Sequence, residues 1–162
     1  MRVLNKINMQ KYIDAHCHLT NNATLGDILT RATKINVIWA INNAAKISDW
    51  PDIIEISEKN HDIVGAIGIH PWYISDVPDN WSDVMQDLLL QNPQIQIGEI
   101  GLDKHKPDMD LQISVFEQQL SLAHELGRGV SLHCVGAWEH IARILRVFQN
   151  KLPCFILAYA YN

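Results

Sequence analysis

The chain is poor in cysteine, and the few cysteines it has form no recognisable motif. Of its 162 residues only Cys17, Cys134 and Cys154 are cysteines, and no two of them have C-x-x-C spacing. Each lies in an apolar segment typical of a β-strand. We therefore expect buried free thiols in a reducing compartment, the cytoplasm, rather than a disulfide framework.

Long hydrophobic runs are also missing from the sequence. No stretch approaches the roughly 18 consecutive apolar residues that a membrane-spanning helix needs, so no membrane association is expected. The first eight residues lack the continuous apolar core of a signal peptide. We expect residues 1–11 to be an N-terminal extension and residues 12–162 to form the folded domain.

Positive charge and glycine-rich phosphate loops are scarce as well. The formal net charge is −5, which argues against non-specific adhesion to nucleic acid or to an anionic membrane. It does not exclude a phosphodiester substrate, because bound cations can dominate the field inside a site. The turn at residues 19–24, LTNNAT, has no G-x-G-x-x-G or P-loop pattern, which excludes a nucleotide-binding doubly wound sheet.

Apolar segments of strand and helix type alternate along the whole chain. With 48% hydrophobic and 19% charged residues, the composition is that of one globular domain. Strict alternation predicts a mainly parallel sheet with right-handed crossovers. Strands are predicted near residues 12–17, 35–41, 62–69, 94–100, 129–134 and 153–159. Helices are predicted at residues 24–34, from about 51 onward, and at 80–92, 110–126 and 137–148. Hydrophobic residues at helical spacing, expected to face the core, include Trp81, Val84, Leu111, Phe116, Trp138 and Phe148.

The end of the first predicted strand carries two histidines in an H-x-H pattern. Side chains alternate along a strand, so His16 and His18 should project to one side and Cys17 to the other. Two imidazoles held side by side form half of a divalent-metal site. The pattern alone is also compatible with two packed or solvent-facing histidines.

Three later strand ends carry further polar side chains. Glu99 closes an apolar strand face, His133 ends another apolar run, and His70 precedes Pro71. A salt bridge is a less favoured explanation for Glu99, and a turn would explain His70 about as well. Because ligands in parallel α/β sheets bind at the carboxyl ends of the strands, however, all five side chains are expected on one rim.

At this point the sequence resembles the TatD-type deoxyribonucleases, metal-dependent hydrolases of the amidohydrolase-like superfamily. The segments that carry the resemblance are YIDAHCHLT, IVGAIGIHPWY, IQIGEIGLD, LQISVFEQQLSLAHELG and GVSLHCVGAW. The resemblance implies an α/β fold of the (β/α)₈ TIM-barrel type. About six of the eight strands would be present, so the barrel is expected to be incomplete and the chain to be a truncated family member.

The resemblance also implies a role for each residue of the rim. His16 and His18 would bind one divalent ion (Zn, Mg or Mn), His133 would bind a second, and Glu99 would bridge both as the catalytic carboxylate. His70 would line the pocket for a DNA substrate. The histidine that the family has after the sixth strand is absent from residues 155–162. The family's aspartate on a later strand would lie beyond Asn162. We therefore expect at most one tightly bound ion and impaired phosphodiester hydrolysis.

Two other functions remain open at this stage. The chain could be an inactive remnant that binds a metal ion or a partner, or an amidohydrolase that acts on cyclic amides or esters. Glu99 favours the nuclease, because the amidohydrolases often have a lysine at that place.

Open sheet edges with exposed Ile13, Phe155 and Leu157 would also favour self-association. The particular metal, the exact substrate and the oligomeric state are not determined by the sequence.

Overall fold

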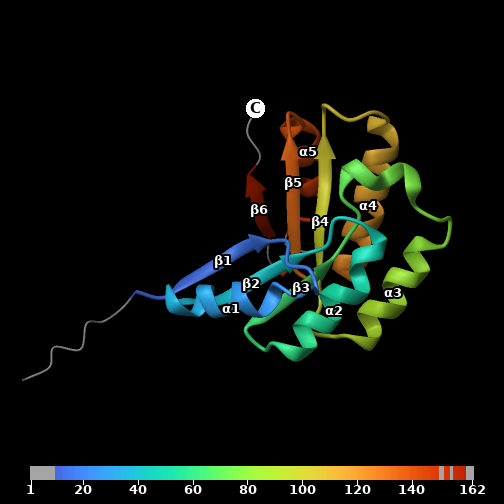
Figure 1. The fold of residues 1–162 in the computed structure, drawn as a ribbon. Helices are drawn as coiled ribbons and strands as arrows, with labels where there is room; N and C mark the ends of the chain where they lie inside the picture. The colour runs from blue at the N-terminus through green and yellow to red at the C-terminus, as the bar shows by residue number, and fades with distance from the viewer. Residues whose placement is uncertain (1–9, 150–151, 154, 160–162) are drawn as a thin grey trace, which may run out of the picture.

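A computed structural model describes residues 10–149, 152–153 and 155–159 of the chain. Its core is one sheet in which six strands follow the order of the sequence, β1 to β6, and every adjacent pair is parallel (Figure 1). The strands are β1 (Tyr12–Cys17), β2 (Val37–Asn43), β3 (Ile63–Ile67), β4 (Gln96–Asp103), β5 (Val130–Val135) and β6 (Phe155–Tyr159). The α-helices are α1 (Leu25–Lys34), α2 (Trp50–Lys59), α3 (Trp81–Gln91), α4 (Met109–Glu125) and α5 (Trp138–Val147). Two 3₁₀ helices, η1 (Ile47–Asp49) and η2 (Pro71–Asp76), follow β2 and β3.

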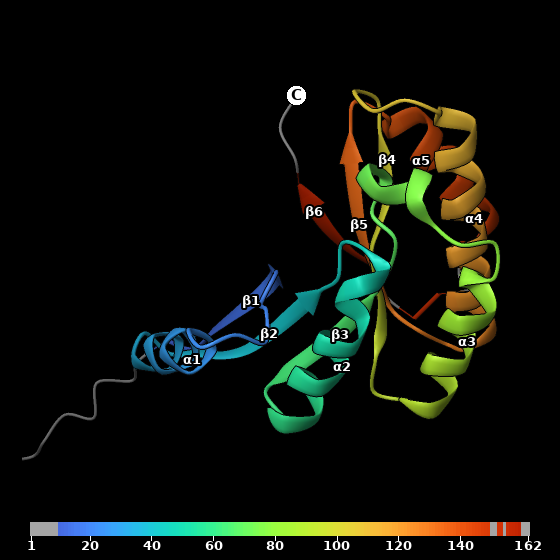
Figure 2. The ribbon, with the colours of Figure 1, turned by 45° about the vertical axis from the view of Figure 1, so that its right-hand side comes forward.

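This arrangement confirms the predicted fold class, an incomplete α/β sheet of the TIM-barrel type. Among the described residues, β1 pairs only with β2, and β6 pairs only with β5, so the sheet has two unpaired edges. Figure 2 shows α3 and α4 on one side of β4 and β5, whereas α1 lies with β1 and β2 away from these helices.

Two strands lie later in the sequence than predicted. The apolar run at Ile35 begins inside the turn that closes α1, where Asn36 has a positive φ of 63°, so β2 starts only at Val37. Strand β4 continues to Asp103 instead of ending near Glu99. The carboxylates of Glu99 and Asp103 are therefore both buried within β4, a placement that sequence periodicity alone would not favour.

The buried core lies between the sheet and the helices that cover it. It includes the predicted side chains of Trp81 and Phe116. The prediction of a core position is wrong for three residues, because Val84, Leu111 and Trp138 are exposed. Helix α3 packs through the stripe of Trp81, Met85 and Leu89, and Val84 lies off that stripe. Leu111 and Trp138 lie in the first turns of α4 and α5, at the rim of the sheet.

Local sequence signals explain several helix ends. Pro51 lies in the first turn of α2, where its missing N–H costs no helical hydrogen bond. Gly127 follows α4 with a φ of +63°, the left-handed conformation that glycine adopts without strain. The start of α2 at Trp50 and the end of α4 at Glu125 agree with the helices predicted from about residue 51 and at residues 110–126.

Some expectations fall outside the part of the chain that the structure describes. These are residues 1–9 of the predicted extension (1–11), the thiol of Cys154, and the side chains of Phe155 and Leu157. Within the described part, no helix is both long enough and apolar enough to cross a membrane.

Candidate metal centre

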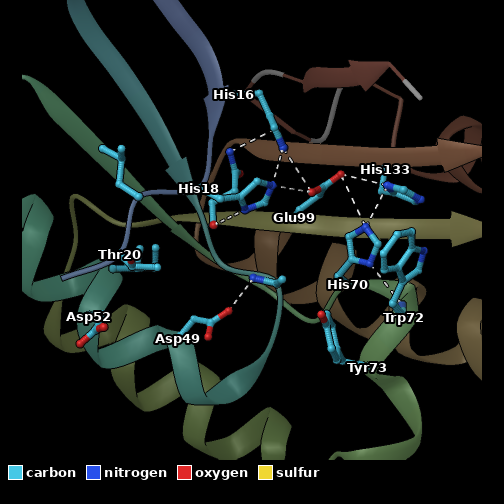
Figure 3. Close-up of a pocket in the computed structure, with 14 residues that line it drawn as sticks. His16, His18, Thr20, Asp49, Asp52, His70, Trp72, Tyr73, Glu99 and His133 are labelled. Atoms are coloured by element: carbon cyan, nitrogen blue, oxygen red, sulfur yellow. Dashed lines mark hydrogen bonds and ion pairs between the residues drawn. The ribbon is translucent and has the colours of Figure 1, made fainter. Parts of the chain in front are cut away.

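All five predicted site residues meet at the carboxyl ends of the strands. His16 lies in β1 and His18 follows it, Glu99 lies in β4, His133 lies in β5, and His70 precedes η2. They line a cavity of about 530 Å³ (Figure 3). The sheet thus brings together side chains that are up to 117 positions apart (133 − 16) in the sequence.

The centre of this site is the buried carboxylate of Glu99. Its Oε2 lies 3.2 Å from Nε2 of His16 and 3.4 Å from Nε2 of His18. Its Oε1 lies 3.0 Å from Nδ1 of His133 and 3.8 Å from Nε2 of His70. Figure 3 shows Glu99 between these two pairs of rings. Each carboxylate oxygen therefore faces its own pair of imidazoles.

The spacing of these atoms fits divalent metal ions. Ligand atoms held at about 2.0–2.2 Å from one ion lie roughly 3–3.5 Å from one another. The Nε2 atoms of His16 and His18 are 3.1 Å apart, and both are 3.2–3.4 Å from Glu99 Oε2. Two groups could thus hold an ion, His16–His18–Glu99 and His70–Glu99–His133, and they share Glu99.

Hydrogen bonds indicate which nitrogen of His18 and His133 is free to ligate. His18 Nδ1 lies 2.8 Å from the carbonyl oxygen of Asn43, which can only accept, so Nδ1 carries the proton and Nε2 has a lone pair. His133 Nε2 faces Oδ2 of Asp103 at 3.4 Å, which places the proton on Nε2 and leaves Nδ1 free toward Glu99. A carboxylate behind a ligating imidazole is a common arrangement at metal sites.

His70 differs from these two histidines because its protonated nitrogen, and not its lone pair, faces the site. Its Nδ1 accepts a hydrogen bond of 3.2 Å from the backbone N–H of Trp72, so in the neutral ring the proton is on Nε2. That Nε2–H points to His133 Nδ1 at 2.9 Å. In this tautomer His70 is a hydrogen-bond donor in the cavity and not a metal ligand.

His16 is oriented from the neighbouring strands. Its Nδ1 lies 3.1 Å from Oγ of Ser131 and 3.2 Å from Nδ2 of Asn43. The Oδ1 of Asn43 is buried without a partner. Because Asn43 Nδ2 also donates to the carbonyl of Ile41 at 3.2 Å, the Ser131 hydroxyl is the group that can accept a proton from His16 Nδ1, which leaves Nε2 as the lone-pair nitrogen.

The pKa values of the site follow from burial and from these contacts. Burial alone would raise the pKa of Glu99, but in the metal-free site His133, His16 and His18, when protonated, donate to its oxygens, and this outweighs burial and holds the pKa far below 4.5. Burial lowers the pKa of His70 to about 4, and the neighbouring His133 adds to this, so His70 is neutral at pH 7. The protonated ring of His18 can donate to Glu99, and this raises the pKa of His18 against the effect of burial.

Sequence reasoning did not predict that Asp103 and Asn43 support the site by orienting its histidines. Asp103 accepts hydrogen bonds from the indole N–H of Trp72 (2.6 Å) and the backbone N–H of His105 (2.9 Å), besides facing His133. Polar residues at the ends of the apolar runs VIWAINN and IGEIGLD were the available signal. Cys17 behaves as predicted: its thiol turns away and donates to the carbonyl of Ile41.

A parallel α/β sheet with a histidine–carboxylate cluster at the carboxyl ends of its strands defines the class of metal-binding TIM-barrel-type proteins. Residues 13–158 match the family model described as TatD related DNase. The chain belongs to this family.

Individual relatives agree with this membership. An uncharacterised metal-dependent hydrolase of Methanocaldococcus jannaschii is 30% identical over 93% of this chain and 60% of its own length. The 3′-5′ ssDNA/RNA exonuclease TatD of Edwardsiella piscicida is 26% identical over 90% of this chain and 58% of its own length. The crystal structure of YjjV, a TatD homologue from Escherichia coli K12, superposes with a TM-score of 0.77 at 27% identity. That match covers 84% of this chain and 55% of YjjV, so this chain spans somewhat more than half the length of the relatives it matches.

Proposed function

We propose that this chain carries the metal-binding part of a divalent-metal-dependent hydrolase site that cleaves phosphodiester bonds in DNA. The observation that carries the proposal is the position of Glu99, with one carboxylate oxygen facing His16 and His18 and the other facing His133. Family membership supports it, as do the names of relatives such as the human deoxyribonuclease TATDN3, which is 28% identical.

In this proposal four residues hold the metal. His16 and His18 would hold one divalent ion, His133 would hold a second, and Glu99 would contribute a carboxylate oxygen to each. The lone pairs on His18 Nε2 and His133 Nδ1 suit this assignment. Imidazole and carboxylate ligands suit Zn and Mn, and Mg would rely more on the carboxylate.

The protein groups around the metal positions bind and orient the substrate. Bound divalent ions supply Lewis acidity toward the phosphoryl group and lower the pKa of water. His70, which is neutral with its proton on Nε2, donates a hydrogen bond to a non-bridging phosphate oxygen. Asp103 keeps the His133 ring in place. Because Trp72, His105 and His133 already engage its oxygens, Asp103 is unsuited to act as the general base.

The test is hydrolysis of a 3′-labelled single-stranded DNA oligonucleotide by the 162-residue chain, with Zn, Mn or Mg added after removal of metal. We expect slow, chelator-sensitive cleavage that Glu99→Gln abolishes. Lys34→Ala, on the exposed end of α1, is a matched control that should retain the wild-type rate. Cleavage that persists in excess chelator would contradict the proposal.

One observation favours a second candidate, a metal-binding protein with no turnover of its own. Strand β6 pairs Ala158 with His133 and Tyr159 with Cys134, and residues 155–159 include no histidine. The rim thus gains no imidazole from β6. Stoichiometric metal binding without any cleavage in the same assay would select this candidate.

We also infer that residues 12–162 form the folded domain and residues 1–11 an extension. The start of β1 at Tyr12 supports this boundary. Limited proteolysis followed by mass spectrometry tests it, because an early cut before Tyr12 should leave the rest of the chain intact.

A reducing compartment, the cytoplasm, is the location we propose. Cys17 and Cys134 are free thiols in the described part of the chain. Burial, with the charge of Asp14, raises the pKa of Cys17 to about 12, so this thiol stays protonated and inert at neutral pH. Localisation of a tagged protein in cells tests this proposal.

A further inference from the structure

A second cavity lies beside the metal centre and has no role in the site described so far. It has a volume of about 700 Å³ and lies between the segment after β4 and the start of α5. We call it the distal groove. Its lining residues are Lys104, Lys106, Met109, Gly136, Ala137, Trp138, Glu139 and His140.

The distal groove combines an exposed aromatic ring with positive charge. Trp138, the first residue of α5, is 40% exposed although it is large and apolar. Lys104 and Lys106 line the same groove, with Glu139 as the one carboxylate among the lining residues. This local excess of positive charge contrasts with the net charge of −5 for the whole chain.

Backbone contacts fix the position of Lys104 in the groove. The N–H of Lys104 donates to the carbonyl of Val135, which joins the end of β4 to the end of β5. Gly136 follows with a φ of +60°, and a Cβ there would lie 3.2 Å from Cβ of Lys104 and 3.3 Å from its Cδ. The absence of a side chain at Gly136 therefore leaves room for the Lys104 stem along the groove wall.

Lys106 links the distal groove to the cavity of the metal centre. Its Nζ lies 4.4 Å from the centroid of the Trp72 ring, and Trp72 lines that cavity. The Trp72 ring is 53% exposed, yet its indole N–H is held by Asp103. Farther along the rim, the ammonium group of Lys46 lies 5.9 Å from the ring centroid of Tyr73. Exposed aromatic rings with lysines beside them thus continue from the metal centre to the groove.

We propose that the distal groove binds a nucleotide of a single-stranded nucleic acid whose neighbouring phosphodiester lies at the metal centre. Trp138 stacks on an unpaired base, and Lys104 and Lys106 contact the flanking phosphates. Stacking on aromatic rings beside a basic track is how proteins bind single strands without reading their sequence. The inference rests on the proposed function, since it assigns the strand a path toward that same site.

The test is binding of a fluorescein-labelled oligothymidylate of about eight nucleotides to the full chain in chelator, which prevents cleavage. We expect Trp138→Ala to weaken binding about tenfold, and Trp138→Phe to restore most of it. Lys104→Ala/Lys106→Ala should weaken binding by a similar factor and lower the slope of log K against log salt by about 1.4.

Matched controls separate this proposal from the proposed function. Trp39→Ala removes a tryptophan of similar exposure (44%) on β2, and Lys11→Ala/Lys34→Ala removes two charges elsewhere; both should bind like wild type. If the groove variants bind like wild type while Trp72→Ala weakens binding, the groove proposal is wrong and the proposed function stands. If a duplex binds as tightly as the single strand, stacking by Trp138 is refuted. If wild type binds no oligonucleotide in chelator, the groove proposal fails, whereas the proposed function is decided separately by the cleavage assay with added metal.

Discussion

The carboxylate of Asp103 lies 3.4 Å from Nε2 of His133, on the side of the ring opposite Glu99. This contact sets the proton on Nε2 and directs Nδ1 toward the shared carboxylate. Removing the charge at Asp103 should therefore weaken metal binding without removing a ligand. We expect Asp103→Asn to lower the affinity of the His133 position about 10–100-fold, measured by calorimetric titration with Zn. Asp87→Asn, an exposed change on α3, should have no effect; a similar loss there would show that the effect is not local.

The tautomers predict a difference between two histidines that are both within reach of Glu99. His18→Ala removes a lone-pair nitrogen and should lower metal affinity strongly. His70→Ala removes an Nε2–H donor and should change metal affinity much less, while weakening binding of a phosphodiester. Zn titration of the two variants, with His61→Ala as an exposed control, checks this. Equal losses of Zn affinity in His18→Ala and His70→Ala would contradict this prediction and show that His70 is a ligand.

The buried, neutral state of His70 predicts a pH dependence of stability in metal-free buffer. Its pKa falls from 6.5 when unfolded to about 4 when folded. Below pH 6.5 the unfolded chain takes up a proton that the folded chain does not, so the free energy of unfolding decreases as the pH falls toward 4. From about pH 7.5 to about pH 5 this loss is about 2 kcal/mol. In His70→Gln, the decrease in the free energy of unfolding between these two pH values, measured by urea unfolding, should be smaller by this amount. Identical pH profiles of stability for wild type and His70→Gln would contradict the prediction.

The unpaired edge of β1 predicts self-association of the isolated chain. Tyr12 and Ile13 on this strand are 51% and 64% exposed, and Trp39 on the adjacent strand is 44% exposed. An open strand edge with apolar side chains favours pairing with another chain. Light scattering coupled to size exclusion should detect oligomers, and Ile13→Lys should shift them toward the monomer. Val147→Lys, at an equally exposed position (63%) on α5, should not do so. A wild-type chain that stays monomeric at micromolar concentration would refute the prediction.

The parallel sheet and the shared rim of the site residues could be predicted from the sequence pattern, whereas the barrel-type strand order was implied only by the family resemblance. The sheet and the rim follow from local regularities: strand side chains alternate with a period of two, and helical segments separate successive strands. His16, His18, His70, Glu99 and His133 each end or follow an apolar run, so topology alone brings them to one edge.

Other features were decided only by the tertiary structure. Which oxygen of Glu99 faces which ring, and which nitrogen of His70 or His133 carries the proton, depend on contacts between distant segments. His16, for example, is held by Ser131, which is 115 positions away. The exposure of Trp138 has the same origin, because its helical spacing is that of a core residue but its place at the rim leaves it uncovered. Sequence patterns determine which face of an element a side chain occupies, whereas the partner it meets there is set by how the elements pack.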